Sequence, residues 1–208
     1  MTTIPANPTP LRAARGTARA RTPEAVGDAE LVSGSPDGFT VLFDRHAAAL
    51  HRYCARRVGA DLADDLVSET YLTAFRARHR FDPARGQALP WLYGICTNLL
   101  RRHRRDEARA YKMLARTGVD PLATTDGTDR SLDRVEASMS SRALAGALAA
   151  LPAKQRDVLL LFAVADLSYP EIAAALSIPD GTVRSRLSRA RNTVRTHLTR
   201  SLPNRSAS

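Results

Sequence analysis

The sequence predicts an all-α protein with two small helical domains joined by a flexible linker, the C-terminal one a helix-turn-helix. Three observations predict this fold class. Apolar residues recur at helical spacing over most of residues 37–199, Gly, Thr and Asp interrupt that period over 112–138, and a short turn near residue 178 separates two helical segments. A chain of 208 residues with 44% hydrophobic content is large enough for two such cores.

Residues 1–36 are expected to form a disordered basic tail. The segment is rich in Ala, Pro, Thr, Gly and Arg, and it has no sustained helical period. A basic arm could contact nucleic acid, but a solvated segment is the preferred interpretation of such a composition. The first domain is therefore placed at residues 37–111.

Three helices are expected in this domain. Two amphipathic helices cover about 39–53 and 62–78, and a Pro- and Gly-containing loop follows at 81–86. A third helix starts near Leu89 with Pro in its first turn and continues into the basic run at 101–105. Trp91 is expected in the core. The third helix is thus apolar at one end and cationic at the other.

An acidic flexible linker is expected at residues 112–138, because the helical period is lost there. Its acidic residues are Asp120, Asp126, Asp129, Asp133 and Glu136. The second domain, at 139–199, has a break at Pro152 and then a strongly apolar helix up to Val164. Residues 200–208 are expected to form a C-terminal tail.

The end of the second domain has the pattern of a helix-turn-helix. Ser168 and Glu171 form a predicted capping box, so a helix begins near Tyr169, and the turn at 177–181 leads to a second helix from about Gly181. That helix has a periodic apolar face of Val183, Leu187, Val194 and Leu198. Its other face carries Arg184, Ser185, Ser188 and Arg189.

The chemistry of that polar face favours DNA binding. Arginine can contact a guanine edge with two hydrogen bonds, and serine can hold a phosphate. The whole chain has 31 Lys+Arg against 21 Asp+Glu, a formal charge of +10, which indicates a polyanionic partner. A merely solvated basic face is the alternative, and the capping box with its short turn favours the DNA reader.

Several other classes of protein are not supported by the sequence. Cys54 and Cys96 lack the paired spacing of a zinc site and are expected as core residues, so no metal and no cofactor is predicted. No phosphate loop or nucleophile motif is found, so no enzymatic activity is expected. The absence of a long apolar stretch and of a signal-peptide pattern predicts a cytoplasmic protein with no membrane insertion.

Five short motifs, in this order and spacing, carry a resemblance to a known family. They are DLVSETYL at 65–72, WLYGICTN at 91–98, LP at 151–152, LSYPEIA at 167–173 and GTVRSRL at 181–187. Over about residues 39–198 the chain resembles an extracytoplasmic-function (ECF) sigma factor, the two-domain form of the bacterial sigma-70 family of transcription initiation factors.

The resemblance implies a function and partners. It implies that the chain binds core RNA polymerase, through the beta-prime clamp helices and the beta flap, as a monomer, and directs promoter-specific initiation. An anti-sigma protein that wedges between the domains is a further partner that the resemblance allows. The linker would run toward the RNA path of the polymerase.

The resemblance also assigns the site residues. The core polymerase surface would comprise Asp65, Glu69 and Arg76. The melted −10 strand would be captured by Asn98, with the loop 81–88, and followed by Arg101, Arg102, Arg104 and Arg105. The −35 duplex would be read by Arg184, Ser185, Ser188 and Arg189.

Two positions depart from the family pattern in a way that concerns the backbone. Asp166 and Ser177 stand where Gly is frequent, and both turns are expected to differ slightly in geometry because these residues enter positive φ less readily.

Two other functions are weighed against a sigma factor. One is a free-standing helix-turn-helix regulator, whose N-terminal helices would sense a ligand or dimerise. It would bind its duplex alone, as a dimer. The other alternative, which is ranked lower, is an RNA-binding adaptor.

Overall fold

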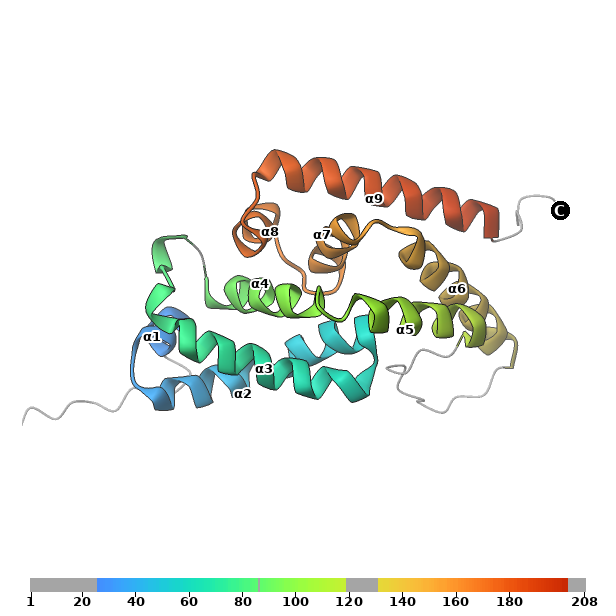
Figure 1. Cartoon of the computed structure of the whole chain (residues 1–208). Helices are drawn as coiled ribbons and strands as arrows, with labels where there is room; N and C mark the ends of the chain where they lie inside the picture. Colours follow the sequence, from blue (N-terminus) through green and yellow to red (C-terminus); the bar gives the residue numbers. More distant parts are fainter. Residues whose placement is uncertain (1–25, 86, 119–130, 202–208) are drawn as a thin grey trace, which may run out of the picture.

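The structure is a computed structural model that describes residues 26–85, 87–118 and 131–201, and over these ranges every regular element is a helix (Figure 1). The predicted all-α class is confirmed for this part of the chain. The gap at 119–130 divides the description into a first unit, residues 26–118, and a second unit, residues 131–201.

The first unit contains five α-helices and two short 3₁₀ turns. They are α1 (Asp28–Ser33), α2 (Pro36–Val58), α3 (Ala60–Ala77), the turns Arg78–Arg80 and Pro83–Arg85, α4 (Ala88–Leu100) and α5 (Arg104–Thr117). Only Gly59 separates α2 from α3, and its φ of 91° is a conformation that favours glycine. The two long helices therefore lie side by side, with Leu42, Leu50 and Leu66 buried between them.

The second unit contains four helices: α6 (Ser131–Ala150), α7 (Ala153–Ala163), α8 (Tyr169–Leu176) and α9 (Asp180–Ser201). Helix α9 packs along α6 and α7, as Figure 1 shows. The buried side chains Val158, Leu161, Ile172, Val183 and Leu187 form its centre. The predicted burial of the α9 apolar face is confirmed for Val183 and Leu187, whereas Val194 and Leu198 are half-buried.

The two units share one hydrophobic core. Helix α4 packs against α8, and α5 packs against α6. Figure 1 shows α4 and α5 running beneath the helices of the second unit. Buried residues from both sides, such as Leu92 and Leu161, belong to the same cluster. The two units therefore contact one another over a broad surface.

The structure corrects the expected limits of the tail and of the linker. Residues 28–33 were expected in a disordered tail, yet they form α1 with Leu31 and Val32 buried. Residues 112–117 and 131–138 were expected in a flexible linker, yet they belong to α5 and α6. The remaining parts of the expected tail, linker and C-terminal tail, at 1–25, 119–130 and 202–208, lie outside the described residues.

The third predicted helix is also shorter than expected. Helix α4 ends at Leu100, and α5 begins at Arg104. The backbone N–H groups of Arg102 and His103 donate to the carbonyls three residues earlier, so the chain makes a tight turn between the helices. The basic run at 101–105 is therefore a turn and a helix start rather than the end of one helix.

Candidate nucleic-acid interface

The helix-turn-helix has the local geometry that its sequence predicts. Glu171 accepts hydrogen bonds from the Ser168 backbone N–H at 2.8 Å and from the Ser168 hydroxyl at 2.6 Å, at the start of α8. Ser177 ends that helix in the left-handed region with φ 52°, and Asp166 before it has φ 53°. Both residues therefore adopt a positive φ, the conformation that side chains other than glycine enter less readily.

All four residues of the predicted −35 face are exposed on α9. Arg184, Ser185, Ser188 and Arg189 lie opposite the buried Val183 and Leu187. The Ser185 hydroxyl donates to the Thr182 carbonyl at 3.1 Å within the helix. The face lies on the outside of the second unit, where a duplex can approach it.

One further arginine extends this face and was missed by the sequence analysis. The Arg191 guanidinium lies over the Phe162 ring, 4.8 Å from its centroid, and Phe162 packs on Tyr169 with 5.8 Å between ring centroids. A shallow hollow nearby is lined by Tyr169, Arg184, Ser188 and Arg191. The available sequence signal was Phe162, an aromatic residue whose ring can orient an arginine.

The residues of the predicted polymerase surface share one exposed face of α3. Asp65, Glu69 and Arg76 are all exposed, and between them Leu72 has 48% of its surface exposed. Leu72 gives this charged face an apolar centre, which is typical of a protein-binding surface.

Of the predicted −10 residues, Asn98 and part of the loop 81–88 line a pocket beside α4. Asn98 is exposed there, and the lining includes Phe81, Asp82 and Trp91 of the first unit. Trp91 was expected in the core, but it is half-buried, with its ring centroid 5.1 Å from that of Phe81. Trp91 lies next to the loop 81–88, so one side of its ring lines the pocket. Sequence spacing alone does not reveal this position.

The second unit supplies the other wall of this pocket. Ala174, Ala175 and Ser177 of α8 and its C-terminal cap line the cavity, whose volume is about 340 Å³. The pocket is thus formed by both units and is open on one side.

The basic run does not form a single surface. Arg101 Nη1 donates to Asn98 Oδ1 at 2.8 Å, and Arg101 Nε donates to Asp157 Oδ2 at 3.3 Å. Arg102 lies 3.4 Å from Glu69, a residue of the predicted polymerase surface. Arg104 and Arg105 are exposed at the start of α5. Only Arg101 is therefore placed beside Asn98.

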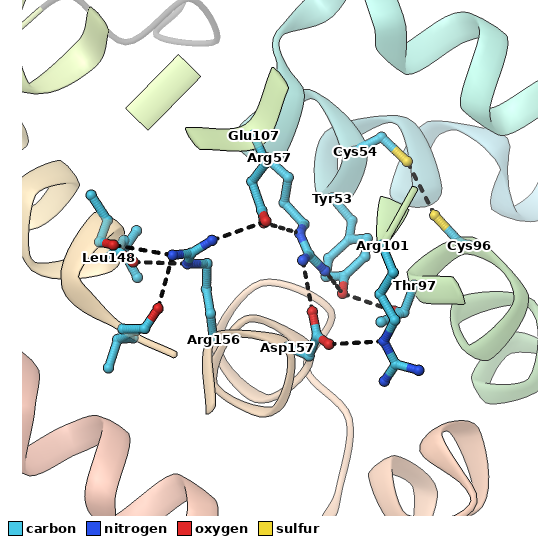
Figure 2. A network of polar contacts seen from close by, with 12 residues as sticks. Tyr53, Cys54, Arg57, Cys96, Thr97, Arg101, Glu107, Leu148, Arg156 and Asp157 are labelled. Atoms are coloured by element: carbon cyan, nitrogen blue, oxygen red, sulfur yellow. Dashed lines mark hydrogen bonds and ion pairs between the residues drawn. The ribbon is translucent and has the colours of Figure 1, made fainter. Parts of the chain in front are cut away.

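A buried network of charged residues connects the two units (Figure 2). Arg57 donates through Nε to Glu107 at 2.7 Å, through Nη1 to the Tyr53 hydroxyl at 2.7 Å, and through Nη2 to Asp157 at 2.7 Å. Burial alone would lower the pKa of Arg57, but the oxygens of these three side chains hold it above its usual value. Arg57 is therefore a fixed positive charge with a partner for each donor group.

Arg156 continues this network in the second unit. Its Nη1 donates to Glu107 at 2.9 Å, and its other nitrogens donate to the carbonyls of Leu148, Ala149 and Leu151. These carbonyls belong to the last turn of α6 and the residue after it, where a helix leaves acceptors unsatisfied. The network was missed by the sequence analysis, and its only signal was the presence of charged residues at helical positions that are otherwise apolar.

The two cysteines are core residues, as expected. Cys54 and Cys96 are buried with their sulfur atoms 3.1 Å apart. The hydrogen bond to Cys96, together with burial, raises the pKa of the Cys54 thiol. Within the described ranges no group of His, Cys, Asp and Glu is arranged to hold a metal ion. None of the helices described is both long and apolar enough to cross a membrane.

Comparison with known families gives two matches, to Sigma-70 region 2 over residues 42–110 and to Sigma-70, region 4 over residues 141–194. Among curated proteins, RNA polymerase sigma factor CarQ of Myxococcus xanthus is 34% identical over 160 residues, which is 75% of this chain and 86% of CarQ. ECF RNA polymerase sigma factor SigL of Mycobacterium tuberculosis is 35% identical over 150 residues, which is 70% of this chain and 80% of SigL.

Two solved structures are similar in fold and in sequence. CnrH in complex with the cytosolic domain of CnrY aligns with a TM-score of 0.55 and 26% identity, covering 82% of this chain and 94% of CnrH. The sigma factor RpoE in complex with the anti-sigma factor NepR from Bartonella quintana aligns with a TM-score of 0.54 and 26% identity, covering 77% of this chain and 96% of RpoE.

Proposed function

This chain belongs to the extracytoplasmic-function group of the sigma-70 family, and from that premise we propose how its two units share the recognition of a promoter. The protein is an RNA polymerase sigma factor, which acts with core polymerase to start transcription. It serves as an initiation factor rather than as an enzyme, and it works in the cytoplasm, where the polymerase is.

The first unit binds core polymerase and the melted −10 strand. The exposed α3 face of Asp65, Glu69 and Arg76 docks on the beta-prime clamp helices, with Leu72 as its apolar centre. Asn98, Trp91 and Phe81 receive an unstacked base, since an aromatic wall beside an amide suits stacking and edge contacts. Arg101, Arg102, Arg104 and Arg105 lie at the adjacent turn and helix start, where they can neutralise the strand backbone.

The second unit reads the −35 duplex and docks on the beta flap. Arg184, Ser185, Ser188 and Arg189 project from α9 into the major groove, and Arg191 extends the contact. In the holoenzyme the chain is a monomer, and an anti-sigma protein is a further partner, as for RpoE with NepR. The linker runs toward the RNA path of the polymerase.

The observation that carries this proposal is that one chain has both an exposed arginine face on α9 and a separate pocket with aromatic lining at Asn98. The exposed arginine face of α9 suits duplex DNA, and the pocket at Asn98 suits a single unpaired base. A free-standing regulator needs only the first site. The match of residues 42–110 to Sigma-70 region 2 also favours a sigma factor.

Reconstituted transcription tests the proposal. Purified protein is mixed with bacterial core RNA polymerase on a genomic promoter library, with core alone as the control. Transcripts that depend on the protein and share −35 and −10 elements are expected. Specific duplex binding by the protein alone, with no stimulated transcription, would instead establish a helix-turn-helix regulator.

A further inference from the structure

Cys54 of α2 and Cys96 of α4 form a contact that the proposed function does not use. Their sulfur atoms lie 3.1 Å apart, within hydrogen-bond distance, and both side chains are fully buried. They are the only two cysteines of the chain. A disulfide has an S–S distance of about 2.05 Å, so the sulfurs must approach by about 1 Å to form one. The pair is therefore close to the geometry of an intramolecular disulfide.

The neighbouring residues hold the two helices together at this contact. The hydroxyl oxygens of Tyr53 and Thr97 lie 3.0 Å apart, one residue before Cys54 and one residue after Cys96 (Figure 2). Tyr53 is itself fixed by Arg57, which donates to its hydroxyl at 2.7 Å. Two successive residues of each helix are thus paired, and this pairing keeps the sulfurs next to one another.

The environment distinguishes the two thiols. A hydrogen bond from Cys54 lowers the pKa of the Cys96 thiol, and the positive charge of Arg57 acts in the same direction, although burial opposes both. The thiolate is the form of cysteine that acts as a nucleophile. Cys96 is therefore the nucleophile of the pair, and Cys54 lies where a resolving thiol is needed.

We propose that Cys54 and Cys96 are a redox site at which hydrogen peroxide forms a disulfide between α2 and α4, and that this disulfide displaces α4 and weakens capture of the −10 strand. The second part rests on the proposed function, because it assumes that Asn98 and Trp91 receive the unstacked base.

The oxidation takes two steps. The Cys96 sulfur attacks one oxygen of the peroxide, the O–O bond breaks, and Cys96 becomes a sulfenic acid while the other oxygen leaves as water. The Cys54 sulfur then attacks the sulfenic sulfur, the S–S bond forms, and the sulfenic hydroxyl leaves as a second water with the proton of Cys54. Two thiols thus lose two electrons in total, and one peroxide is reduced to two waters.

Burial determines which oxidant suits the site. Neither sulfur is exposed to solvent, so the reaction requires a local opening of the core. A small opening admits hydrogen peroxide, which is little larger than water, more readily than a bulky disulfide. The class of oxidant that fits this site is therefore a small peroxide.

Cys96 and the proposed strand site share one helix. Trp91 and Asn98 lie on α4 on either side of Cys96, so a shift of the helix moves both of them. The two cysteines belong to the buried cluster of the core, and close packing leaves little room to absorb an approach of about 1 Å. Binding sites tolerate displacements of only about 0.5 Å. The disulfide is therefore expected to disturb the strand site.

Oxidation is tested on the full-length protein, which is reduced, treated with hydrogen peroxide and then freed of the peroxide. Peptide mapping under non-reducing conditions is expected to show Cys54 linked to Cys96, and a non-reducing gel should show a monomer. Dithiothreitol should restore both thiols.

Two single substitutions test the roles of the thiols. Cys54→Ser keeps a hydrogen-bond donor beside Cys96 but removes the resolving thiol, so a sulfenic acid is expected at Cys96, where dimedone traps it. Cys96→Ser removes the nucleophile, and Cys54 is expected to remain a thiol. Circular dichroism checks that each variant is folded, and the mapping of the wild type does not depend on either of them.

Promoter opening is then measured for protein that is oxidised before it is mixed with untreated core polymerase. Opening is expected to fall at least about fivefold relative to the reduced protein and to recover with dithiothreitol. The double variant Cys54→Ala/Cys96→Ala, treated in the same way, is the matched control, because it keeps the three methionines that peroxide can also oxidise. Its opening should not change.

Three results would overturn the proposal: two free thiols in the wild type after peroxide treatment, a disulfide that leaves promoter opening unchanged, or an equal loss of opening in the double variant. Failure of the reduced wild type to direct promoter-specific transcription would instead refute the proposed function, while the peptide map still tests the disulfide.

Discussion

Arg57 on α2 and Asp157 on α7 are 100 residues apart in sequence and form a 2.7 Å ion pair in which both side chains are 2% exposed or less. Arg57 also bonds Glu107 and the Tyr53 hydroxyl, so one guanidinium connects two helices of the first unit to the second. Besides the shared hydrophobic core, one side chain with three directed donors therefore helps to fix the relative placement of the two units.

Arg57→Lys is expected to lower the free energy of unfolding by about 2 kcal/mol. An ammonium group is compact, so it cannot reach Glu107, Tyr53 and Asp157 together, and a buried acceptor is left without a partner. Urea unfolding followed by circular dichroism measures the change. Arg52→Lys, at an exposed position of the same helix, is the control and should change stability by less than about 0.5 kcal/mol. Equal effects of the two substitutions would contradict the role of the network.

Arg189→Ala is expected to weaken binding to the −35 element by about 1 to 3 kcal/mol and to relax preference at one base pair, because a bidentate contact to a base is lost. Holoenzyme binding to a set of single-base −35 variants measures both effects. Arg200→Ala removes the same charge from the last turn of α9 and should leave the base preference unchanged. Weakening that is uniform over all sequences would assign Arg189 to a phosphate instead.

Asn98→Ala is expected to impair promoter opening while binding to core polymerase is retained. Asn98 is exposed, and its side chain accepts a hydrogen bond from the partly exposed Arg101, so its loss should not disturb folding. Permanganate reactivity of −10 thymines reports opening, and native gels report assembly with core. Asn98→Asp, which keeps the shape but adds a negative charge beside the strand, should impair opening at least as much. Loss of core binding by Asn98→Ala would make the residue structural.

Asp28→Asn is expected to destabilise the protein by about 1 kcal/mol at neutral pH, because Asp28 binds Arg45 at 2.7 Å and His46 at 2.6 Å. Burial opposes ionisation of Asp28, but these two partners lower its pKa below the ordinary value. A carboxylate whose pKa is lower in the folded state than in the unfolded state stabilises the fold. This contribution is fully present at pH values above the unfolded-state pKa of about 4, and it is lost as the pH falls through the folded-state pKa.

The difference in unfolding free energy between wild type and Asp28→Asn should therefore shrink as the pH falls below about 4. Asp44→Asn, at an exposed site within α2, is the control. A difference that grows as the pH falls below about 4 would have the wrong sign for the loss of this carboxylate.

Ser177→Gly is expected to raise stability by about 0.5 to 1 kcal/mol. Ser177 has φ 52° at the end of α8, where a side chain is strained, and the relief exceeds the added entropy of glycine in the unfolded chain. Thermal unfolding measures the change. Ser68→Gly, in the interior of α3, should have the opposite sign and cost about 0.5 kcal/mol. A loss of stability in both variants would show that the turn is unstrained.

Local sequence patterns were sufficient for the features that depend on neighbouring residues. The capping box at Ser168, the exposed arginine face of α9 and the acidic face of α3 follow from helical spacing alone, and the structure places them as expected. Boundaries were less accurate. Residues 28–33 and 112–117 have weak periodicity, and their helices gain stability from packing, as the buried Leu31 and Tyr111 show.

The sequence by itself determined the helical class, the order of the elements, the family and the faces of α3 and α9, because each is encoded by residues within a few turns of one another. Only the tertiary structure decided that Trp91 lines a pocket, that α8 forms one wall of that pocket and that Arg57 pairs with Asp157. The partners in these contacts are distant in sequence. In addition, a charged residue within an amphipathic pattern gives the same sequence signal whether its side chain is solvent-exposed or buried beside an opposite charge. Folding brings those residues together, and each charge that is buried then requires an oppositely charged or hydrogen-bonding partner.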